Sequence, residues 1–548
     1  MSARAAKVVE STAGPSVCAR GKIKRRIVGT WVVGLAAGAL AVMPASAAAD
    51  SSGIEHLKFA AGPYHVIPGA NLILDQLGSV PKPHVDGFMI RMQPNLVYAL
   101  PNGKRGKVPR TDIVHLHHAV WLSTGTSGQG EGQGGVYGRL AVPLYPFMAA
   151  GEEKTVIEFP QGFGYPIGAS DTWILNYMIH NLSDKAQNVY VTYDMDFVPA
   201  TSPLASTITP VHPIWMDVED HHIYPVFNVK RGSGRKGQFT FPDEAKNPYG
   251  GGPSLNEFPV DHPGTLIGTA GHMHPGGLRD ELDLIRPGVK PTGRAIRGPV
   301  PDSVRLFRSN AVYWDPGHTP ISWDLSMTAT APDWRPQVQQ GDVLRISATY
   351  DSKLASWYEV MGIMVVWEAW GDQYGVNPFT HRLDEHGHVT HGHLPENWHY
   401  GGTQWVGVNP TSLPACRTQK VIIAGFKYIP AVTGNTNCVP TIKRGQSITF
   451  LNEDADPMGT FSPINPNPFY LASVFHTVTT CKYPCRLNYG ISYPLANGSG
   501  NLDSGQLGVG LPGVGRLTWR TPTSLPPGTY AFFCRIHPWM RGVFRILR

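Results

Sequence analysis

The chain has 548 residues, a formal net charge of +6, 61 glycines, 49 prolines and six cysteines. Its length predicts three to four domains at ~150 residues each, and its frequent glycine and proline leave no sustained helical periodicity. Removing residues 1–47 takes seven Lys or Arg and one Glu from the totals of 46 and 40, so 39 of each remain and the net charge becomes zero. A neutral chain gives no indication of nucleic-acid binding or of electrostatic recruitment to a membrane surface.

Residues 1–47 have the pattern of a signal peptide. The basic stretch KIKRR begins at Lys22, an apolar run follows, and PASAAAD supplies small residues for cleavage near Ala47. The apolar run is short for a membrane span. We therefore expect export with cleavage, a secreted or extracytoplasmic location (periplasm or cell envelope), and no stable membrane insertion afterwards. The twin-arginine and general export routes both stay open.

The rest of the chain predicts an all-β protein. Short runs such as NVYVTYDMDFV and DVLRISATY are rich in β-branched and aromatic residues and end at Gly, Pro, Asn or Asp. This pattern indicates antiparallel β-sandwiches. We expect a first block over residues 55–204, a second over 205–375, a His/Gly/Pro-rich linker over 376–414 and a third block over 415–548.

Histidines mark the strands of the first block. The stretch DIVHLHHAVWL carries His115, His117 and His118, and WILNYMIHN ends an apolar run at His180. Because side chains alternate along a strand, the pattern by itself favours His115 with His117 on one face. Two imidazoles at this spacing are a common metal-binding arrangement.

The second block carries a further pair of histidines and two methionines. His272 and His274 lie in TAGHMHPGG, and Met361 and Met364 lie in YEVMGIM with opposite parity on a strand. Imidazoles with one thioether and no thiolate favour redox-active copper over structural zinc.

The linker is rich in histidine. Its two His-x-His pairs predict either a further metal site or a solvated linker, and both interpretations stay open. The linker histidines are His386, His388, His391, His393 and His399. Three other histidines, expected at the surface or in the core, are His212, His221 and His222.

The third block ends in YAFFCRIHPWM, which places Cys534, His537 and Met540 at three-residue intervals. His476, in SVFHTVTTC, supplies a second imidazole. Two imidazoles, one thiolate and a thioether are the ligands of a blue-copper site. Because a strand would alternate the three ligands between its faces, they can converge only from a turn.

The cysteines indicate which thiol is left unpaired. Cys18 leaves with the signal peptide, and the other five lie beyond residue 415. Pairs of Cys416 with Cys438 and of Cys481 with Cys485 would leave Cys534 as the unpaired thiol that a metal ligand needs to be. The sequence does not decide this connectivity.

The third block resembles the cupredoxins, and its Cys-x2-His-x2-Met spacing is similar to that of short-loop members such as amicyanin. The resemblance covers about 130 residues. It implies a Greek-key β-sandwich with one type 1 copper held by His476, Cys534, His537 and Met540.

The first two blocks resemble the copper type II, ascorbate-dependent monooxygenases, the family of the peptidylglycine and dopamine enzymes. The resemblance implies two consecutive jelly-roll-like sandwiches, each binding one copper. Carried over, the ligands are His117, His118 and His180 in the first block, and His272, His274 and Met361 in the second, which also form the catalytic site. This choice replaces His115 by His118 and requires the chain to bend at 117–118. Met361 follows an acidic residue as in the family, whereas an ungapped alignment would place Tyr358 there.

Two departures limit what the resemblance implies. Residues 50–415 contain no cysteine, although the animal enzymes are disulfide-rich, and Ala270 replaces the arginine that the peptide-amidating enzyme carries two residues before its His-x-His. A peptidylglycine substrate is therefore doubtful. The remaining prediction is a copper monooxygenase that uses O2 on a small organic molecule, with electrons from ascorbate or a redox protein delivered through the type 1 copper block.

Two other classes stay open. A non-catalytic copper carrier or copper store is favoured by the histidine-rich linker. A multicopper oxidase would need a His-Cys-His sequence at the blue ligand, but Phe533 and Arg535 flank Cys534.

Overall fold

The protein is all-β, with one short 3-10 helix (η2, Pro203–Thr207) in the part of the chain that the structure describes. The computed structural model describes residues 53–125 (apart from 69, 71, 72 and 112), 144–218, 226–244, 256–314, 320, 323–371, 375–394, 412–454, 475–481, 502–510, 513–537 and 539–548. Within these ranges, no helix has the length and hydropathy needed to cross a membrane. The expected signal peptide lies outside the described residues.

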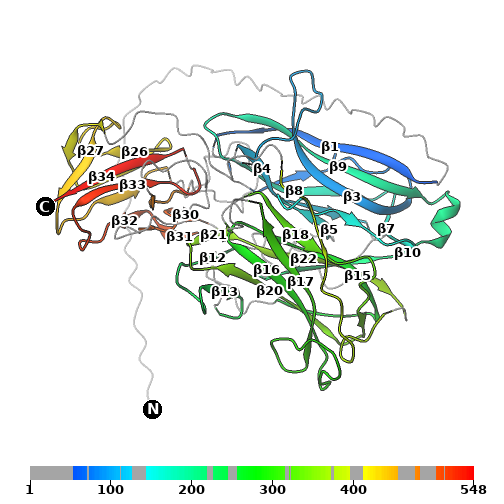
Figure 1. Cartoon of the computed structure of the whole chain (residues 1–548). Helices are drawn as coiled ribbons and strands as arrows, with labels where there is room; N and C mark the ends of the chain where they lie inside the picture. Colours follow the sequence, from blue (N-terminus) through cyan, green and yellow to red (C-terminus); the bar gives the residue numbers. More distant parts are fainter. Residues whose placement is uncertain are drawn as a thin grey trace, which may run out of the picture. The chain divides into compact units, whose positions relative to one another are not determined.

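The first block is a sandwich of two sheets. Its strands are β1 (Glu55–Val66), β2 (Ile73–Leu77), β3 (Gly87–Tyr98), β4 (Val114–Ser123), β5 (Tyr145–Ala150), β6 (Ile157–Glu158), β7 (Phe163–Ile167), β8 (Trp173–Asn181), β9 (Gln187–Pro199) and β10 (Thr209–Pro210). One sheet has the order β1-β9-β3-β7-β10 with β6 beside β3, and the other has the order β2-β8-β4-β5. The long strands β1, β9 and β3 lie side by side in Figure 1.

Strand β4 is the central feature of the smaller sheet. It pairs with β8 on one side and β5 on the other, and all ten of its residues are buried. A strand covered on both faces reads as a nearly continuous apolar run. The histidines of β4 are therefore polar groups in a dry environment, and each needs a hydrogen-bond partner or a metal.

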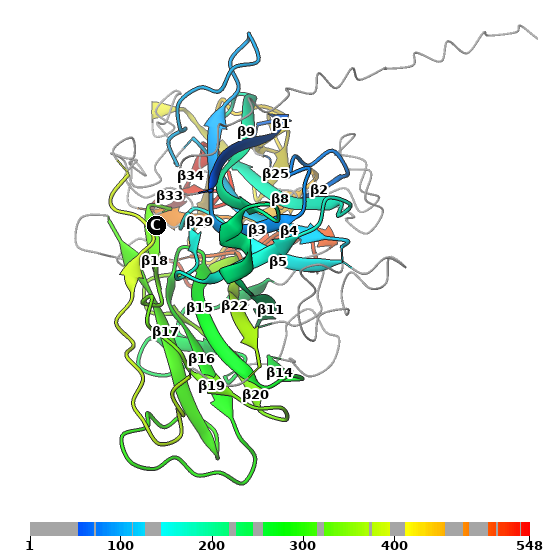
Figure 2. The same ribbon diagram turned by 90° about the vertical axis from the view of Figure 1, so that its right-hand side faces the viewer.

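The second block is built on one large sheet. Its strands are β11 (His212–Asp217), β12 (Phe227–Val229), β13 (Gln238–Phe241), β14 (Glu257–Pro259), β15 (Gly264–Met273), β16 (Gly277–Ile285), β17 (Ser303–Tyr313), β18 (Leu325–Ala329), β19 (Gln337–Val338), β20 (Val343–Asp351), β21 (Trp357–Val360), β22 (Gly362–Trp370) and β23 (His388–Val389). The main order is β11-β22-β15-β18-β17-β16-β20-β13, and β12 pairs with β21. Figure 2 shows β15, β16 and β17 running alongside one another.

The two faces of β22 pack into different cores. Met364 and Val366 belong to the core of the second block, whereas Val365 and Trp367 pack into the core of the first. This follows from the two-residue period of a strand. The second sheet thus packs its outer face against the first sandwich, and the junction between the two blocks is apolar at Val365 and Trp367.

The chain passes from the first block to the second near Val211. Strand β10 pairs in parallel with β7 of the first block, and β11 pairs with β22 of the second. The boundary expected after residue 204 falls inside the short helix η2. Part of the expected linker also joins the second block, because β23 pairs with β18.

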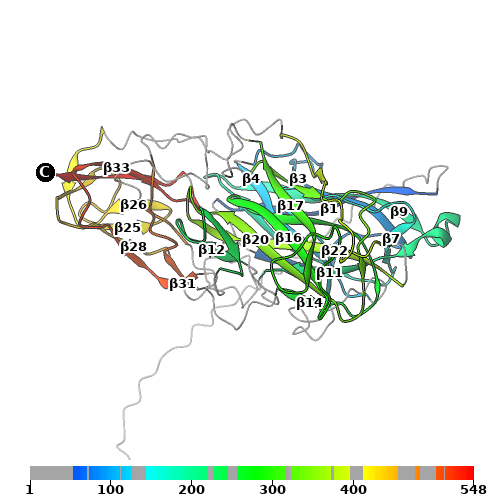
Figure 3. The ribbon, with the colours of Figure 1, turned by 60° about the horizontal axis from the view of Figure 1, so that its bottom comes forward.

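The third block is a separate sandwich. Its strands are β24 (Ala415–Arg417), β25 (Lys420–Ala424), β26 (Lys427–Pro430), β27 (Val439–Lys443), β28 (Thr449–Asn452), β29 (Thr479–Cys481), β30 (Gly508–Gly510), β31 (Gly513–Arg516), β32 (Thr518–Arg520), β33 (Gly528–Phe533) and β34 (Arg541–Leu547). Its sheets have the orders β24-β27-β34-β33-β29 and β26-β25-β28-β32, and β30 pairs with β31. Figure 3 shows β25, β26 and β28 in the second of these sheets.

A disulfide joins Cys416 to Cys438 in the third block, as one of the two expected pairings requires. Cys534 is a buried, unpaired cysteine. The other expected pairing involves Cys485, which lies outside the described residues.

Candidate metal centres

The third block brings His476, Cys534 and His537 together in a buried group. The Cys534 Sγ lies 3.8 Å from His476 Nδ1 and 3.7 Å from His537 Nδ1, and the two Nδ1 atoms lie 3.1 Å apart. Among the described residues, this is the one group of three or more His, Cys, Asp or Glu whose ligand atoms all lie within 4.8 Å of one another. Two imidazoles and a thiolate at this spacing suit a copper ion.

The turn after β33 sets this geometry. The Cys534 N–H donates to the Met540 carbonyl (3.0 Å), and the Met540 N–H donates to the His537 carbonyl (2.8 Å). These bonds close the loop and leave Met540 only 2% exposed. The three-residue spacing therefore lies on a turn, as its chemistry requires.

Several groups hold the ligands in place. The N–H groups of Thr477 and His537 donate to Cys534 Sγ at 3.4 Å, and His476 Nε2 donates to Asp454 Oδ2 at 2.9 Å. Such outer partners fix the imidazole tautomer so that the other ring nitrogen faces the metal. The Phe426 ring lies edge-on to both imidazoles and excludes water.

These contacts favour the thiolate. Burial alone raises the pKa of Cys534, but the hydrogen bond and charge of His476 and the two N–H donors outweigh it and lower the pKa of the thiol. The thiolate is the form that binds metal.

A second cluster, the front histidine cluster, lies at the junction of the first two blocks. It contains six buried imidazoles, from His115, His117, His118, His180, His272 and His274. The rings of His117 and His274, one from each block, lie 4.0 Å apart between centroids. The two sets of expected ligands therefore adjoin one another.

A bulge in β4 directs its histidines. The register with β8 shifts between Leu116 and His118, leaving His117 as the extra residue. A bulge bends the strand and changes which way its side chains point. This is the bend at 117–118 that the choice of His117 and His118 requires.

Each imidazole of the cluster has a buried ring nitrogen without a hydrogen-bond partner. These atoms are His115 Nε2, His117 Nδ1, His118 Nδ1, His180 Nδ1, His272 Nε2 and His274 Nε2. An unpaired buried polar atom costs about 1–3 kcal/mol, so six in one place fit a site built to bind a ligand. Histidine is the commonest metal ligand among side chains.

For several of these histidines, the opposite nitrogen is anchored. His115 Nδ1 lies 2.7 Å from the Thr111 carbonyl and His274 Nδ1 lies 2.8 Å from the Glu359 carbonyl. His272 Nδ1 lies 3.0 Å from Glu153 Oε2. Carbonyl and carboxylate partners are typical of metal-binding histidines. Glu153 was not expected from the sequence, because it belongs to the first block and its partner His272 to the second.

Burial keeps five of the imidazoles, those of His115, His117, His118, His180 and His274, in the neutral form that binds metal. It lowers the pKa of His118 to about 3 and that of His180 to about 4. The pKa values of His115, His117 and His274 are also lowered, first by burial and then by the neighbouring imidazoles.

His115 belongs to the cluster, although the family resemblance had set it aside. Its ring lies 5.2 Å from that of His180 and 6.4 Å from that of His117, and the His117 and His180 rings lie 6.0 Å apart. His115, His117 and His180 thus contact one another pairwise. The alternation of the strand was the signal that pointed to His115.

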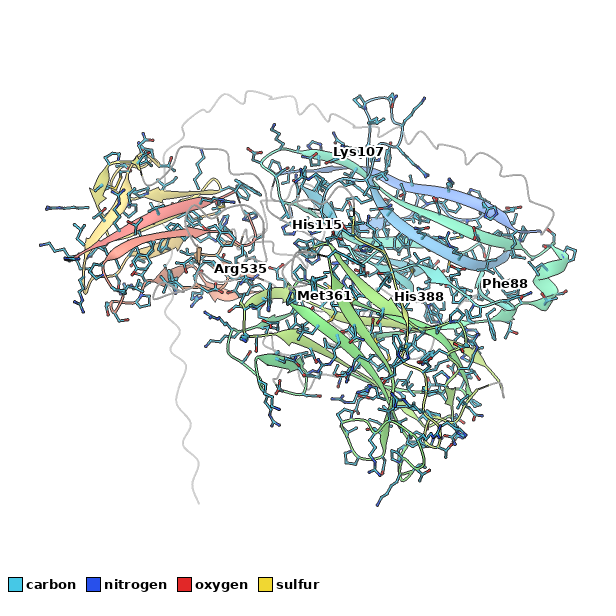
Figure 4. All side chains as sticks on the ribbon, viewed as in Figure 1. Phe88, Lys107, His115, Met361, His388 and Arg535 are labelled. Atoms are coloured by element: carbon cyan, nitrogen blue, oxygen red, sulfur yellow. A yellow bond between two sulfur atoms is a disulfide. The ribbon has the colours of Figure 1, made fainter. Side chains whose placement is uncertain are left out.

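The structure separates the two candidate methionines. Ile363 is the register partner of His272, and Met361 packs with Ile363. Met364 is the register partner of Gly271 and lies in the core of the second block. Met361 therefore packs beside the residue that faces His272, and Met364 faces away. Figure 4 labels Met361 and His115.

A hydroxyl ties two of the expected ligands together. Tyr350 Oη accepts from the His274 N–H at 3.1 Å and donates to the Met361 carbonyl. Tyr358, the other candidate, instead lies under the Arg535 guanidinium, which is 5.3 Å from its ring centroid.

The two candidate metal-binding regions contact each other through the loop of the third block. His180 Nε2 donates to the Ile536 carbonyl at 3.3 Å, and Ile536 directly precedes His537. The Arg535 guanidinium lies 5.2 Å from the Trp357 ring centroid and donates to the Ser356 carbonyl. Neither Arg535 nor Ile536 was expected from the sequence, because their partners are about 180 and 360 residues away.

The described linker histidines have protein partners. His391 Nε2 lies 2.8 Å from the Leu325 carbonyl, and His393 Nδ1 lies 2.5 Å from Asp324 Oδ2. His386 pairs with Asp384, and His388 lies in β23. His221, His222 and His399 lie outside the described residues, and His212 stacks on Trp370.

The chain is similar to several solved structures. A copper(I) form of an amicyanin variant is 18% identical over 26% of this chain and 90% of its own, with a TM-score of 0.14. The copper-containing nitrite reductase of Thermus scotoductus SA-01 is 15% identical over 53% of this chain and 59% of its own, with a TM-score of 0.16. No protein-family model and no curated protein matches the chain.

Proposed function

We propose that the protein is an exported copper monooxygenase whose third block supplies electrons to the front histidine cluster. The observation that carries this proposal is the set of six buried, unpartnered imidazole nitrogens at the junction of two sandwiches. One of these histidines, His180, contacts the loop that carries Cys534 and His537. The reaction inserts one atom of O2 into a C–H bond and converts the other to water, consuming two electrons and two protons. An external one-electron donor, ascorbate or a redox protein, provides the electrons.

Copper, when bound, would supply one-electron chemistry for the reaction with dioxygen. The residues of this chain would hold and shield it. His117, His118 and His180 are the proposed ligands of the first block, and His272, His274 and Met361 those of the second, with His115 available beside His180. Glu153 and the Thr111 and Glu359 carbonyls fix the imidazole tautomers.

The third block acts as a tethered donor. A covalent tether raises the effective concentration of a donor to the millimolar range when the linker is short and flexible. The hydrogen bond from His180 to the Ile536 carbonyl joins a proposed front ligand to the residue next to His537. The stacked Arg535 holds this loop against Trp357.

The test compares wild-type protein with Cys534→Ser, after copper loading, by copper content, optical absorption and electron-spin resonance. We expect three coppers in the wild type, one blue and two ordinary, and two in the variant with the blue absorption lost. In single turnover, the two front coppers of the variant should reoxidise without any change in blue absorption, and their reduction should depend on added ascorbate. Equal turnover of both proteins with a redox-protein donor would contradict the tethered-donor role.

A copper carrier is the second candidate. It is favoured by the histidine-rich linker, in which His386 and His388 are exposed. A carrier would exchange its front copper readily with a chelator and consume no O2. Tightly held front copper together with O2 uptake would exclude it.

A further inference from the structure

A cavity of about 430 Å³ lies between the first two blocks, with His272 in its wall. Its volume is in the usual range of small-molecule sites, about 300–1,000 Å³. The segment 148–161 of the first block forms one side, and β15, β18 and β22 form the other. His388, labelled in Figure 4, also lines it.

The register of β15 and β22 shows which side chains face the cavity. Gly268 pairs with Trp367, Ala270 with Val365 and His272 with Ile363. Antiparallel partners share a face, and Val365 and Trp367 face the first block. Gly268, Ala270 and His272 therefore face it too, and the two small residues leave the space beside His272.

The walls are largely apolar, and the hydroxyls of Thr155 and Thr330 in them are already hydrogen-bonded. Thr155 Oγ1 donates to Glu153 Oε1 at 3.2 Å, and Thr330 Oγ1 accepts from the Thr269 N–H at 3.0 Å. Most of the remaining lining is Ala, Val, Ile, Pro, Phe and Trp. An apolar ligand gains the burial of its own surface in such a space.

The cavity offers no cation to a charged ligand. No lysine or arginine is among the described residues that line it. The carboxylate of Glu158 is 74% exposed and lies 3.8 Å from Arg91 Nε, so its charge belongs to the surface. A ligand carboxylate would be buried without a partner, which is costly.

We propose that this cavity binds an uncharged, largely apolar organic molecule and presents it to the site at His272. That the bound molecule is the substrate rests on the proposed function, whereas the binding itself does not. Ala270, in place of an arginine, is thus part of a pocket selective for neutral molecules.

The test is calorimetric titration of the copper-free full chain with two neutral probes, 1-naphthol and cyclohexanol, and with charged 1-naphthalenesulfonate. The neutral probes should bind, and the sulfonate should bind at least about tenfold more weakly than 1-naphthol, because it would bury an unpaired charge. Equal affinity for 1-naphthol and the sulfonate, or no binding of either neutral probe, would overturn the proposal. This comparison needs no variant.

Cavity-filling variants test whether the probe binds in this cavity. A Cβ added at Gly268 meets only Thr330 Oγ1, at 3.4 Å, so Gly268→Leu has room to fold. Gly268→Leu and Ala270→Leu should each lower the affinity for 1-naphthol at least about tenfold, because the leucine side chain fills the space. Gly392→Leu adds the same side chain where nothing lies within 4 Å, and should bind as the wild type does. Unchanged binding in both folded filling variants would overturn the proposal.

Copper-loaded protein separates this proposal from the proposed function. Binding of 1-naphthol without O2 uptake or a hydroxylated product would support the cavity and reject the monooxygenase. Hydroxylation of a molecule that still reacts in Gly268→Leu and Ala270→Leu would support the monooxygenase and reject the cavity.

Discussion

Replacing Glu153 by glutamine tests whether the front histidine cluster is built to bind metal. Glu153 Oε2 accepts from His272 Nδ1 at 3.0 Å, and its Oε1 accepts from the Gly151 N–H at 2.6 Å. Burial raises the pKa of Glu153, but His272 and the backbone donors outweigh burial and lower it, so the carboxylate is charged. Glutamine keeps the size and removes the charge.

The expected effect follows from the burial of the pair. The two side chains are 5% and 1% exposed, so water cannot replace the lost partner. A hydrogen bond to a charged group contributes about 1.5–3 kcal/mol, and loss of an outer partner lowers metal affinity about 10–100-fold. A factor of ten corresponds to about 1.4 kcal/mol, so the two ranges agree. We expect a loss near the upper end, about 30–100-fold.

The assay is competition for copper(I) against a chromophoric chelator, in a Cys534→Ser background that removes the blue site. The matched control is Glu152→Gln. Burial raises the pKa of Glu152 to about 8, with Glu153 and Asp324 adding to the effect. Glu152 is therefore mostly uncharged at pH 7, and glutamine should leave the affinity unchanged. A folded Glu153→Gln protein with wild-type affinity would refute the reasoning.

Three other predictions concern single features. An acid whose pKa is higher in the folded state binds its proton more tightly there, so the free energy of unfolding falls as pH rises from about 4 to about 8. Glu152→Gln should therefore lose less thermal stability than the wild type between pH 5 and pH 9. An equal drop in melting temperature for the two proteins would contradict this. The Cys416–Cys438 bridge closes a loop with a sequence separation of 22, so replacing both cysteines by serine should destabilise the third block by about 3 kcal/mol. The blue absorption should then be lost at a lower urea concentration, and an unchanged midpoint of this urea transition would refute the prediction. A Cβ at Gly151 would lie 2.6 Å from both the His117 carbonyl oxygen and His272 Cε1. Gly151→Ala should therefore lower the copper affinity of the front histidine cluster at least about tenfold, whereas Gly392→Ala should not. Equal copper affinity in Gly151→Ala and the wild type would show that the junction relaxes around the added methyl group.

The candidate ligands of the third block could be predicted from the sequence because three of the four are close together along the chain. Cys534, His537 and Met540 lie on one turn, and the chemistry of the three groups requires that turn. His476 is distant in sequence but follows an apolar strand, and the structure brings its Nδ1 to 3.8 Å from Cys534 Sγ. Asp454, which anchors His476, had no comparable signal.

The front histidine cluster could be predicted from the sequence only in part. All six of its histidines are candidates on the sequence alone, but the choice between His115 and His118 depended on a resemblance, whereas the structure places both beside His117. The preference for Met361 over Met364 depends on the register of β22 against β15, which a single strand does not reveal.

The sequence by itself determined the all-β class and the kinds of donor atoms available, and it offered the Cys416–Cys438 pair with an unpaired Cys534 as one possible connectivity, which the structure then showed. These follow from local patterns of period two, turn residues and residue chemistry. Only the tertiary structure decided that the two histidine sets adjoin one another, that Glu153 anchors His272, and that Ile536 contacts His180. These contacts join residues more than a hundred positions apart, and they depend on how apolar faces pack together, which no local pattern encodes.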